Sequence, residues 1–345
     1  EYTLHRTCVG GNKGIQKDLD DGIDTIGKKM TVCQLYAKQI RHRGNVRYNT
    51  KNGRKRLMKL LEEDKLGGCP IDSVKLSDAK EWAIRMKEKG ISYKTISNDK
   101  RSLKAAFYTA IQDDCIRKNP FDFQLNTVIE DDTEPKVPLT PAQEESFLSF
   151  AQNDKVYQKY YDELIILLGT GLRISELCGL TDTDINFENR IINVDHQLLR
   201  SAETGYYIET PKTKSGIRQI PMSEKVYEAF NRVLKRRRGA KAVTIDGYSN
   251  FLFLNRDGYP KTATNYDGMF RGLAKKYNKY HEEALPKVMT PHTLRHTFCT
   301  NMANAGMNPK ALQYIMGHSN ITMTLNYYAH ATFDSAKAEM LRIAA

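Results

Sequence analysis

Residues 169–177 read Gly-Thr-Gly-Leu-Arg-Ile-Ser-Glu-Leu and follow an apolar run at 164–168. The glycines mark a turn between two helices, with Arg173 at the turn and Glu176 one helical turn further on. An arginine this close to an apolar segment is partly buried, and a buried guanidinium needs an anion. Glu176 could be that anion, so Arg173 taken alone indicates a structural role more readily than a catalytic one.

The sequence around this turn predicts an α/β unit. Thr140 can cap a helix that Pro141 opens at its first position, and helices are expected at 142–154 and 157–169. Helical periodicity returns from about residue 223. Strand-like runs are expected between these helices, at 191–199, 206–209 and 217–220.

A turn between two of these runs carries two lysines, in Lys-Thr-Lys-Ser-Gly-Ile-Arg at 212–218. A lysine at the tip of a hairpin is mobile and can reach into a groove. Lys212 and Lys214 share a strand face if the hairpin is regular, so their positions do not choose between them.

Residues 290–296 read Thr-Pro-His-Thr-Leu-Arg-His. His292 and Arg295 are three residues apart, so both side chains can meet at one point beside a helix. His292 and His296 have the spacing of a metal-binding pair. No glutamate follows the first histidine and no third ligand is evident, so a metal site is not favoured and His296 is interpreted as structural.

A glycine-histidine pair and two adjacent tyrosines occur between residues 317 and 328. Gly317 marks a helix end, and His318 follows it directly. Tyr327 and Tyr328 would point about 100° apart on a helix, so only one can face a given site. Either tyrosine is by default a core residue.

The positive charge is concentrated in one part of the chain. The chain carries 53 Lys and Arg against 41 Asp and Glu, a net charge of +12. Residues 28–120 hold 23 of these basic residues and 10 of the acidic ones, so this segment accounts for the whole excess. Such a concentration is typical of a phosphate-binding domain, although a solvated lysine-rich helical surface would look the same.

Residues 28–125 show helical periodicity and predict a compact helical domain. Short hydroxyl residues and cations mix on one predicted helix at 92–104, a combination that suits contacts to a DNA backbone. The candidate DNA-binding residues are Lys94, Lys100, Arg101 and Lys104.

The remaining boundaries follow from composition. Residues 1–27 are interpreted as a leader or the remnant of an upstream region, and the acidic, proline-containing 126–138 as an exposed linker. A second domain is expected at 139–333 and a tail helix at 334–345. Six cysteines without a Cys-x-x-Cys pair favour a reducing cytosol, and no apolar run is long enough to span a membrane.

Taken in order, Arg, Lys, His-x-x-Arg, Gly-His and Tyr form a set that resembles the tyrosine recombinase, or phage-type integrase, family. Residues 210–221, Thr-Pro-Lys-Thr-Lys-Ser-Gly-Ile-Arg-Gln-Ile-Pro, look similar to conjugative-transposon integrases of Gram-positive bacteria. The resemblance implies a mainly α fold with a small antiparallel β-sheet. A helical core-binding domain and an α/β catalytic domain would form a clamp around DNA.

The resemblance also implies roles for individual residues. Two guanidiniums would grip the scissile phosphate, a lysine would protonate the leaving 5′-oxygen, and a tyrosine would attack. Ala329-His330 selects Tyr328 as the nucleophile, the Lys-Ser-Gly match selects Lys214, and Glu176 is a supporting residue. The implied catalytic residues are Arg173, Lys214, His292, Arg295, His318 and Tyr328.

This chemistry requires no metal or other cofactor. The implied partners are double-stranded DNA at element ends and target, a tetramer of the chain on paired sites, an excisionase and a host DNA-bending protein. A cytoplasmic, nucleoid-associated bacterial protein without membrane contact is expected. Two alternatives remain: a type IB topoisomerase-like enzyme, and a catalytically inactive DNA-binding regulator.

Overall fold

The computed structural model describes residues 27–44, 46–134, 137–211, 213–237, 243–328 and 340–341. The chain divides into two compact units, residues 1–134 and 135–345, and the division falls within the segment predicted as a linker. No helix in the described ranges is long and apolar enough to cross a membrane. The predicted leader 1–27 lies outside the described residues except for its last position.

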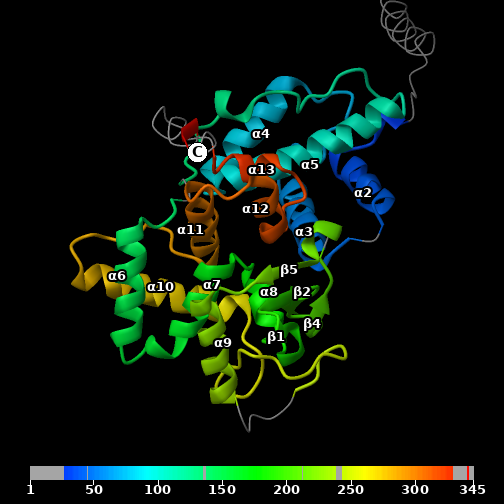
Figure 1. Cartoon of the computed structure of the whole chain (residues 1–345). Coiled ribbons are helices and arrows are strands. Elements are labelled where there is room, and N and C mark those ends of the chain that lie inside the picture. Colours follow the sequence, from blue (N-terminus) through cyan, green and yellow to red (C-terminus); the bar gives the residue numbers. More distant parts are fainter. Residues whose placement is uncertain are drawn as a thin grey trace, which may run out of the picture. The chain divides into compact units, whose positions relative to one another are not determined.

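The elements of the first unit, among its described residues, are helices joined by turns and loops (Figure 1). Thr31 begins the first α-helix with a capping box: its hydroxyl accepts from the Gln34 N–H at 3.2 Å, and the Gln34 amide accepts from the Thr31 N–H at 2.8 Å. The elements are η1 (Gly27–Lys29), α2 (Val32–His42), α3 (Tyr48–Glu62), α4 (Leu76–Glu88), α5 (Tyr93–Gln112) and η2 (Leu125–Thr127).

The core of this unit forms around Trp82 of α4, which is fully buried and meets Phe121 edge-to-face with ring centroids 5.8 Å apart. Leu125 and Ile129 belong to the same core. Within the described part of the predicted linker, residues 126–134, Ile129 alone is buried, and the other side chains are exposed or half-buried.

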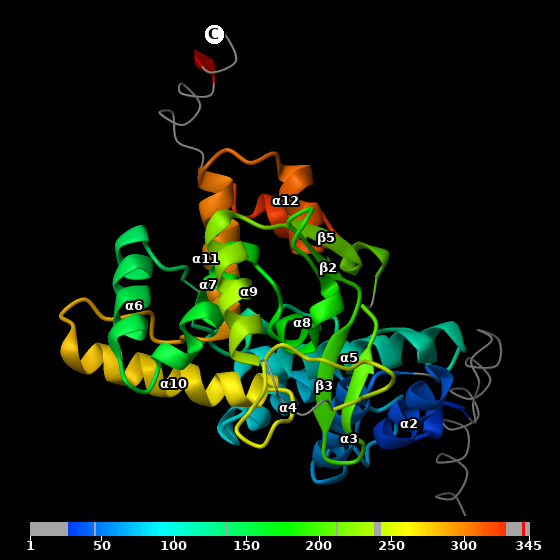
Figure 2. The ribbon, with the colours of Figure 1, turned by 60° about the horizontal axis from the view of Figure 1, so that its bottom comes forward.

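The second unit contains the remaining elements (Figure 2). As predicted, Thr140 caps the first helix, its hydroxyl accepting from the Gln143 N–H at 3.1 Å, and Pro141 opens it. The helices are α6 (Pro141–Asn153), α7 (Tyr161–Thr170), α8 (Ile174–Gly179), α9 (Glu224–Arg237), α10 (Ala263–Tyr280), α11 (Pro291–Asn304), α12 (Pro309–Met316) and α13 (Thr322–Leu325), with short η3 (Gln158–Tyr160) and η4 (Asp182–Asp184) turns.

Helix α7 is the centre of this unit. It packs against α6, α9 and α11, and both ribbon views place it among them (Figures 1 and 2). Its residues 164–168 are buried on every side, which explains why they form an unbroken apolar run. The end of α7 and the start of α8 are thereby held rigidly, and this is where Arg173 lies.

Two small antiparallel sheets complete the unit. The first has the order β1-β2-β5 and the second pairs β3 with β4. The strands are β1 (Ile185–Asn186), β2 (Ile191–Val194), β3 (Gln197–Ser201), β4 (Gly205–Glu209) and β5 (Arg218–Pro221).

The single strand expected at 191–199 is broken at Asp195 and His196. His196 is buried, with Nε2 2.8 Å from the Gly179 carbonyl oxygen and Nδ1 2.5 Å from Asp195 Oδ1. These bonds turn the chain inward between β2 and β3. The predicted fold class is confirmed: the protein is mainly helical with small antiparallel sheets.

Candidate active site

The turn between α7 and α8 requires glycine. Gly171 has a φ of +63°, and a Cβ there would lie 2.4 Å from Phe298 of α11. This close approach brings the start of α8 against α11. Arg173 follows as the N-cap of α8, and its backbone N–H donates to Glu176 Oε2 at 2.8 Å.

The Arg173 guanidinium is about one-third exposed and makes two bonds. Its Nη1 lies 2.7 Å from Glu176 Oε1, and its Nη2 donates to the Gly317 carbonyl at 2.9 Å. The pairing with Glu176 anticipated from the sequence is therefore present. The second bond reaches the turn that precedes His318.

Arg295 lies on α11 and is 6% exposed. Its guanidinium donates to the carbonyls of Gly171 and Met316. Because Arg173 holds the Gly317 carbonyl, the two arginines bind consecutive carbonyls at the end of α12. Arg173 and Arg295, far apart in sequence, thus lie close together at the end of α12.

His318 follows a left-handed glycine, Gly317, with a φ of +60°. It is 6% exposed, and its Nδ1 lies 2.9 Å from the Thr324 hydroxyl. Burial, followed by the positive charges of Arg295 and Arg173, lowers its pKa to about 4. His318 is therefore neutral at pH 7 in the DNA-free protein.

His292 and His296 flank Arg295 on α11, and His292 is exposed. Neither belongs to a group with metal-ligand spacing among the described residues; the one such group is Asp184, Asp195 and His196. Both ring nitrogens of His196 are already hydrogen-bonded to protein oxygens, so that group is explained without an ion.

The two tyrosines lie just beyond α13 and point to different partners. The Tyr327 hydroxyl is 2.7 Å from His296 Nδ1, whereas the Tyr328 hydroxyl donates to the Met307 carbonyl at 2.5 Å. Burial raises the pKa of Tyr327 to about 12, and the charge of Arg295 opposes that rise. Burial also raises the pKa of Tyr328. Both rings pack against the cluster that includes Phe298 and Cys299 of α11, but only the Tyr327 hydroxyl contacts a histidine of that helix.

Lys214 lies in a 3-10 turn, η5 (Lys214–Gly216), and its side chain is exposed. This turn joins β4 to β5, which belong to different sheets, so the expected hairpin is wrong. Lys212 lies outside the described residues, and the choice between the two lysines stays a prediction.

Arg218 is a buried member of this site that the sequence did not single out. Its side chain has no exposed surface and binds Glu176 with both terminal nitrogens, Nη2 at 2.8 Å from Oε2 and Nη1 at 3.1 Å from Oε1. A signal was present: Arg218 alternates with Ile220 on the buried face of β5. An arginine on the inward face of a strand requires a buried carboxylate.

Glu176 organises the charge of this site. Burial by itself would raise its pKa, but the bonds and charge of Arg218, then the charges of Arg173 and Arg295, lower it to about 2. One carboxylate therefore faces three guanidiniums. Burial lowers the pKa of Arg295 to about 9, and the repulsion from the charge of Arg173 is the next largest cause. A bound phosphate would relieve this repulsion.

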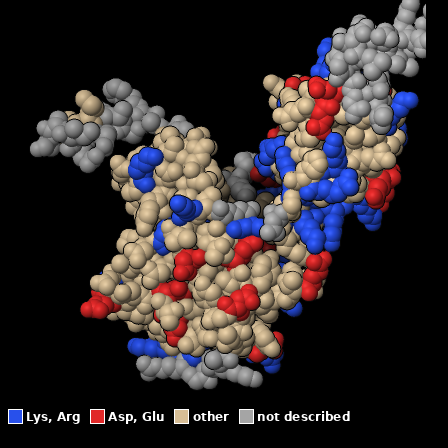
Figure 3. Space-filling view, turned by 90° about the vertical axis from the view of Figure 1, so that its right-hand side faces the viewer, with Lys and Arg blue, Asp and Glu red and all other residues tan. Residues whose placement is uncertain are grey.

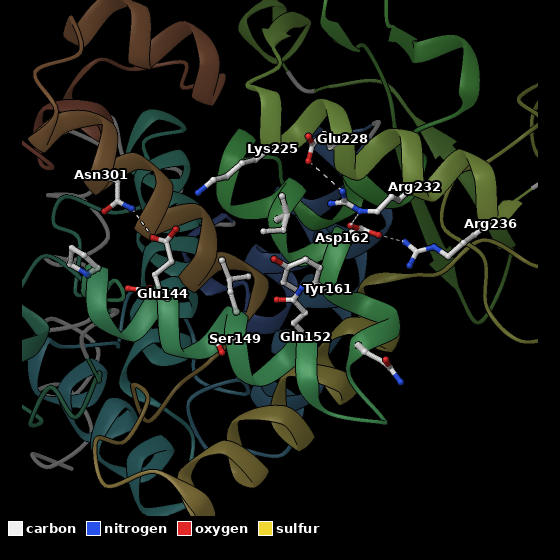
Figure 4. Close-up of a pocket in the computed structure, with 15 residues that line it drawn as sticks. Glu144, Ser149, Gln152, Tyr161, Asp162, Lys225, Glu228, Arg232, Arg236 and Asn301 are labelled. Atoms are coloured by element: carbon white, nitrogen blue, oxygen red, sulfur yellow. Dashed lines mark hydrogen bonds and ion pairs between the residues drawn. The ribbon is translucent and has the colours of Figure 1, made fainter.

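A wide cavity elsewhere in the second unit does not contain these residues. It measures about 1010 Å³ and is lined by α6, α7, α9 and α11 (Figure 4). Three of its charged side chains pair with one another, since Arg232 and Arg236 both bind Asp162. The candidate phosphate-binding residues Arg173 and Arg295 instead lie around the ends of α7 and α12.

The four candidate DNA-binding residues of the first unit differ in exposure. Lys94 and Arg101 of α5 are exposed, and Lys104 pairs with Asp122 at 2.5 Å. Lys100 is buried, with Nζ 2.5 Å from the Phe123 carbonyl oxygen, and this bond does not favour a contact of its ammonium with DNA. Lys and Arg side chains nevertheless gather on one face of this unit (Figure 3).

The lowered pKa of His318 predicts a pH effect on stability. The unfolded chain binds this proton near the ordinary pKa of 6.5, whereas the folded chain binds it only near 4. The free energy of unfolding should therefore fall as the pH drops through this interval. Denaturant titrations between pH 4 and 7 measure this pH dependence of the free energy of unfolding. The variant His318→Asn should show a flatter dependence than the wild type. Identical slopes for the two proteins would contradict the account.

Comparisons with known proteins agree with this geometry. Residues 138–335 match the phage integrase family. The chain is 69% identical over 341 residues to the transposase from transposon Tn916 of Enterococcus faecalis, which covers 98% of this chain and 84% of that protein. A structure of the Tn1549 transposon integrase with a circular intermediate DNA is 78% identical, with a TM-score of 0.87, and the match covers 91% of this chain and 99% of that chain.

A lambda integrase dimer bound to a COC′ core site shares the fold at 16% identity. Its TM-score is 0.59, and the match covers 86% of this chain and 76% of that chain. The family match takes in the whole arginine, histidine and tyrosine constellation of the second unit. The chain therefore belongs to the phage integrase family, the tyrosine site-specific recombinases.

Proposed function

We propose that this chain integrates and excises a mobile element of the conjugative-transposon type by cutting DNA and rejoining it through a 3′-phosphotyrosine. The observation that carries the proposal is the pair Arg173 and Arg295, held on consecutive carbonyls beside neutral His318. The identities to the Tn916 transposase and the Tn1549 integrase support the class of element.

In the proposed reaction the tyrosine oxygen attacks the scissile phosphorus and the bond to the 5′-oxygen breaks. The two guanidiniums compensate the extra negative charge on the non-bridging oxygens. Lys214 gives a proton to the departing 5′-oxygen, and His292 and His318 complete the phosphate cage. Because the phosphotyrosine keeps the energy of the broken bond, the reverse attack by a 5′-hydroxyl rejoins DNA without a nucleotide cofactor.

Tyr327 is the proposed nucleophile, in place of Tyr328. Its hydroxyl contacts the residue after Arg295, whereas that of Tyr328 is held by Met307. The Tn1549 integrase structures include one Arg-to-Lys and one Tyr-to-Phe variant. In that integrase, the substituted arginine and the substituted tyrosine are separated by the same number of residues as Arg173 and Tyr327 are in this chain. The residues that pointed to Tyr328, Ala329 and His330, lie outside the described residues.

The proton of Tyr327 needs an acceptor, because a phenol whose pKa is about 12 is protonated at neutral pH. Family resemblance assigns this role to His292. The observed contact with Nδ1 of His296 favours that histidine as an alternative. A histidine of α11 is the acceptor in either case.

A nicked suicide substrate tests the proposed function. Cleavage next to a nick releases a short fragment, so the covalent complex accumulates and migrates as a protein–DNA adduct in denaturing gels. The adduct should form in buffer with a metal chelator and without a nucleotide. Failure to form any adduct on DNA containing an intact element end would overturn the proposal.

A second substrate distinguishes a topoisomerase-like activity from site-specific recombination. Supercoiled plasmid lacking an element end should remain supercoiled under conditions that give adduct on the specific site. Rapid relaxation of such a plasmid would favour a topoisomerase-like activity. The inactive-regulator alternative would bind the site without giving an adduct.

Two surface residues of α5 should contribute to DNA affinity. The double change Lys94→Ala and Arg101→Ala should weaken binding of both specific and unrelated duplexes, and lower the slope of log affinity against log salt by up to about two. Lys100→Met is the matched control on the same helix, because its buried ammonium bonds the Phe123 carbonyl. A binding titration at several salt concentrations measures both variants. An unchanged salt slope in the double variant would contradict the assignment.

We also propose that the chain assembles as a tetramer on paired sites, aided by an excisionase and a host DNA-bending protein. The predicted tail helix 334–345 lies outside the described residues apart from Met340 and Leu341, which are exposed apolar side chains. Deleting residues 333–345 should weaken synapsis of two sites and spare binding to one. Gel-shift assays with one or two labelled sites measure this, and undiminished synapsis would refute the role of the tail.

A further inference from the structure

Arg218 connects three separate parts of the second unit. Nε donates to the Ile315 carbonyl at 2.6 Å, Nη1 donates to the Gly216 carbonyl at 3.0 Å, and Nη1 and Nη2 bind the two oxygens of Glu176. The side chain has no exposed surface, so water does not compete for these bonds. One guanidinium therefore holds two backbone carbonyls and a carboxylate together.

Each partner belongs to a segment with a proposed task in the reaction. Glu176 is in α8 and also binds Arg173. Gly216 ends the turn that begins with Lys214, and Ile315 is in the last turn of α12, shortly before His318. Arg218 thus lies between the phosphate cage and the segment of the proposed general acid.

The Lys214 turn and the end of α12 are in direct contact. A Cβ at Gly317 would lie 3.0 Å from the Ser215 carbonyl oxygen and 3.1 Å from Arg218 Nη1. Ser215 is the neighbour of Lys214, and Gly317 is the neighbour of His318. The position of the lysine turn is therefore tied to the turn that carries the histidine.

We propose that Arg218 is a positioning residue for strand cleavage, which sets the Lys214 turn against the phosphate cage so that the leaving oxygen is protonated as it departs. The inference rests on the proposed function of Lys214. Lysine cannot replace Arg218, because a single ammonium lacks the planar set of donors that reaches all three partners at once.

Changing the leaving group of the DNA substrate distinguishes a positioning role of Arg218 from a purely structural one. With an ordinary phosphodiester the 5′-oxygen needs a proton from Lys214 as the bond to phosphorus breaks. With a bridging sulfur at that position the leaving group is a thiolate, which departs unprotonated because thiols are far more acidic than alcohols. A residue that acts through the general acid is dispensable for cleavage of the sulfur substrate. A residue that supports the phosphate cage or the fold is needed for cleavage of both substrates.

The test compares cleavage rates on matched oxygen and 5′-sulfur suicide substrates. Arg218→Lys should slow cleavage about 10²-fold on oxygen, within the range of general-acid contributions, and less than about 10-fold on sulfur. Lys214→Ala is the positive comparison, with the same recovery on sulfur. Arg295→Lys is the negative comparison, with similar losses on both substrates because the phosphate is common to them.

The ratio of the two rates is taken within one preparation, so a partly folded sample of Arg218→Lys gives the same ratio. Equal losses on oxygen and sulfur for Arg218→Lys would overturn the inference. Wild-type protein that gives no adduct on either substrate would instead overturn the proposed function. Lys214→Ala without recovery on sulfur would overturn both the general-acid role and the inference.

Discussion

Tyr327→Phe should abolish the covalent protein–DNA adduct while leaving binding to the site intact. The substitution removes only the hydroxyl, which in the DNA-free protein contacts His296 Nδ1 at 2.7 Å. Without that oxygen no phosphotyrosine can form, so the expected loss is complete rather than partial. Adduct formation on a nicked substrate measures the first effect, and a gel shift on uncut DNA measures the second.

Tyr328→Phe is the matched control, because it makes the same change one residue later. Its hydroxyl donates to the Met307 carbonyl, and replacing it removes a hydrogen bond worth about 1 kcal/mol of stability. This variant should keep adduct formation within a few-fold of wild type. The reverse pattern, with adduct lost in Tyr328→Phe and kept in Tyr327→Phe, would restore the nucleophile first chosen from sequence.

Arg295→Lys should reduce the cleavage rate about 10²–10³-fold, the usual cost of losing one donor to a developing anion. The guanidinium of Arg295 is held by the Gly171 and Met316 carbonyls. A lysine ammonium keeps the charge but cannot bind both carbonyls and still present a planar pair of donors to phosphate. Single-turnover cleavage at saturating protein measures the chemical step free of any change in affinity.

Arg232→Lys provides the control for an arginine outside the cage. Arg232 lies on α9 at the wide cavity, where it pairs with Asp162 and Glu228 (Figure 4). Its replacement should leave the cleavage rate unchanged. An Arg295→Lys protein that cleaves as fast as wild type would remove Arg295 from the proposed mechanism.

The parts of this molecule that sequence could predict are those governed by local rules. Thr140 and Pro141 open α6 because a hydroxyl cap and a fixed φ favour a helix start. Gly171 and Gly317 end helices in the left-handed region, as their positions indicated. The meeting of Arg173 with Glu176 followed from their spacing of one helical turn.

The parts that sequence could not predict depend on tertiary contacts. Lys100 lies in a basic, exposed-looking helix, but its helical face turns inward to the Phe123 carbonyl. The lysine turn joins strands of two different sheets, because His196 breaks the expected long strand. The choice between Tyr327 and Tyr328 depends on which hydroxyl reaches α11, and adjacent residues in a sequence do not disclose that direction.

The role of a buried arginine such as Arg218 can be interpreted only after its carboxylate partner is known. Its alternation with Ile220 predicts an inward-facing arginine, yet no spacing rule links it to Glu176 in a different element. Once the fold brings β5 to α8, the same residue accounts for the very low pKa of Glu176. Its position between Lys214 and His318 is the basis for the proposal that Arg218 positions the Lys214 turn.

Peptide mapping of the trapped adduct tests the central claim most directly. The covalent complex formed on a nicked element end is digested with protease and nuclease, and the peptide that carries the nucleotide remnant is sequenced by mass spectrometry. We expect a nucleotide remnant joined through its 3′-phosphate to Tyr327. A remnant on any other residue, or one joined through a 5′-phosphate, would contradict it.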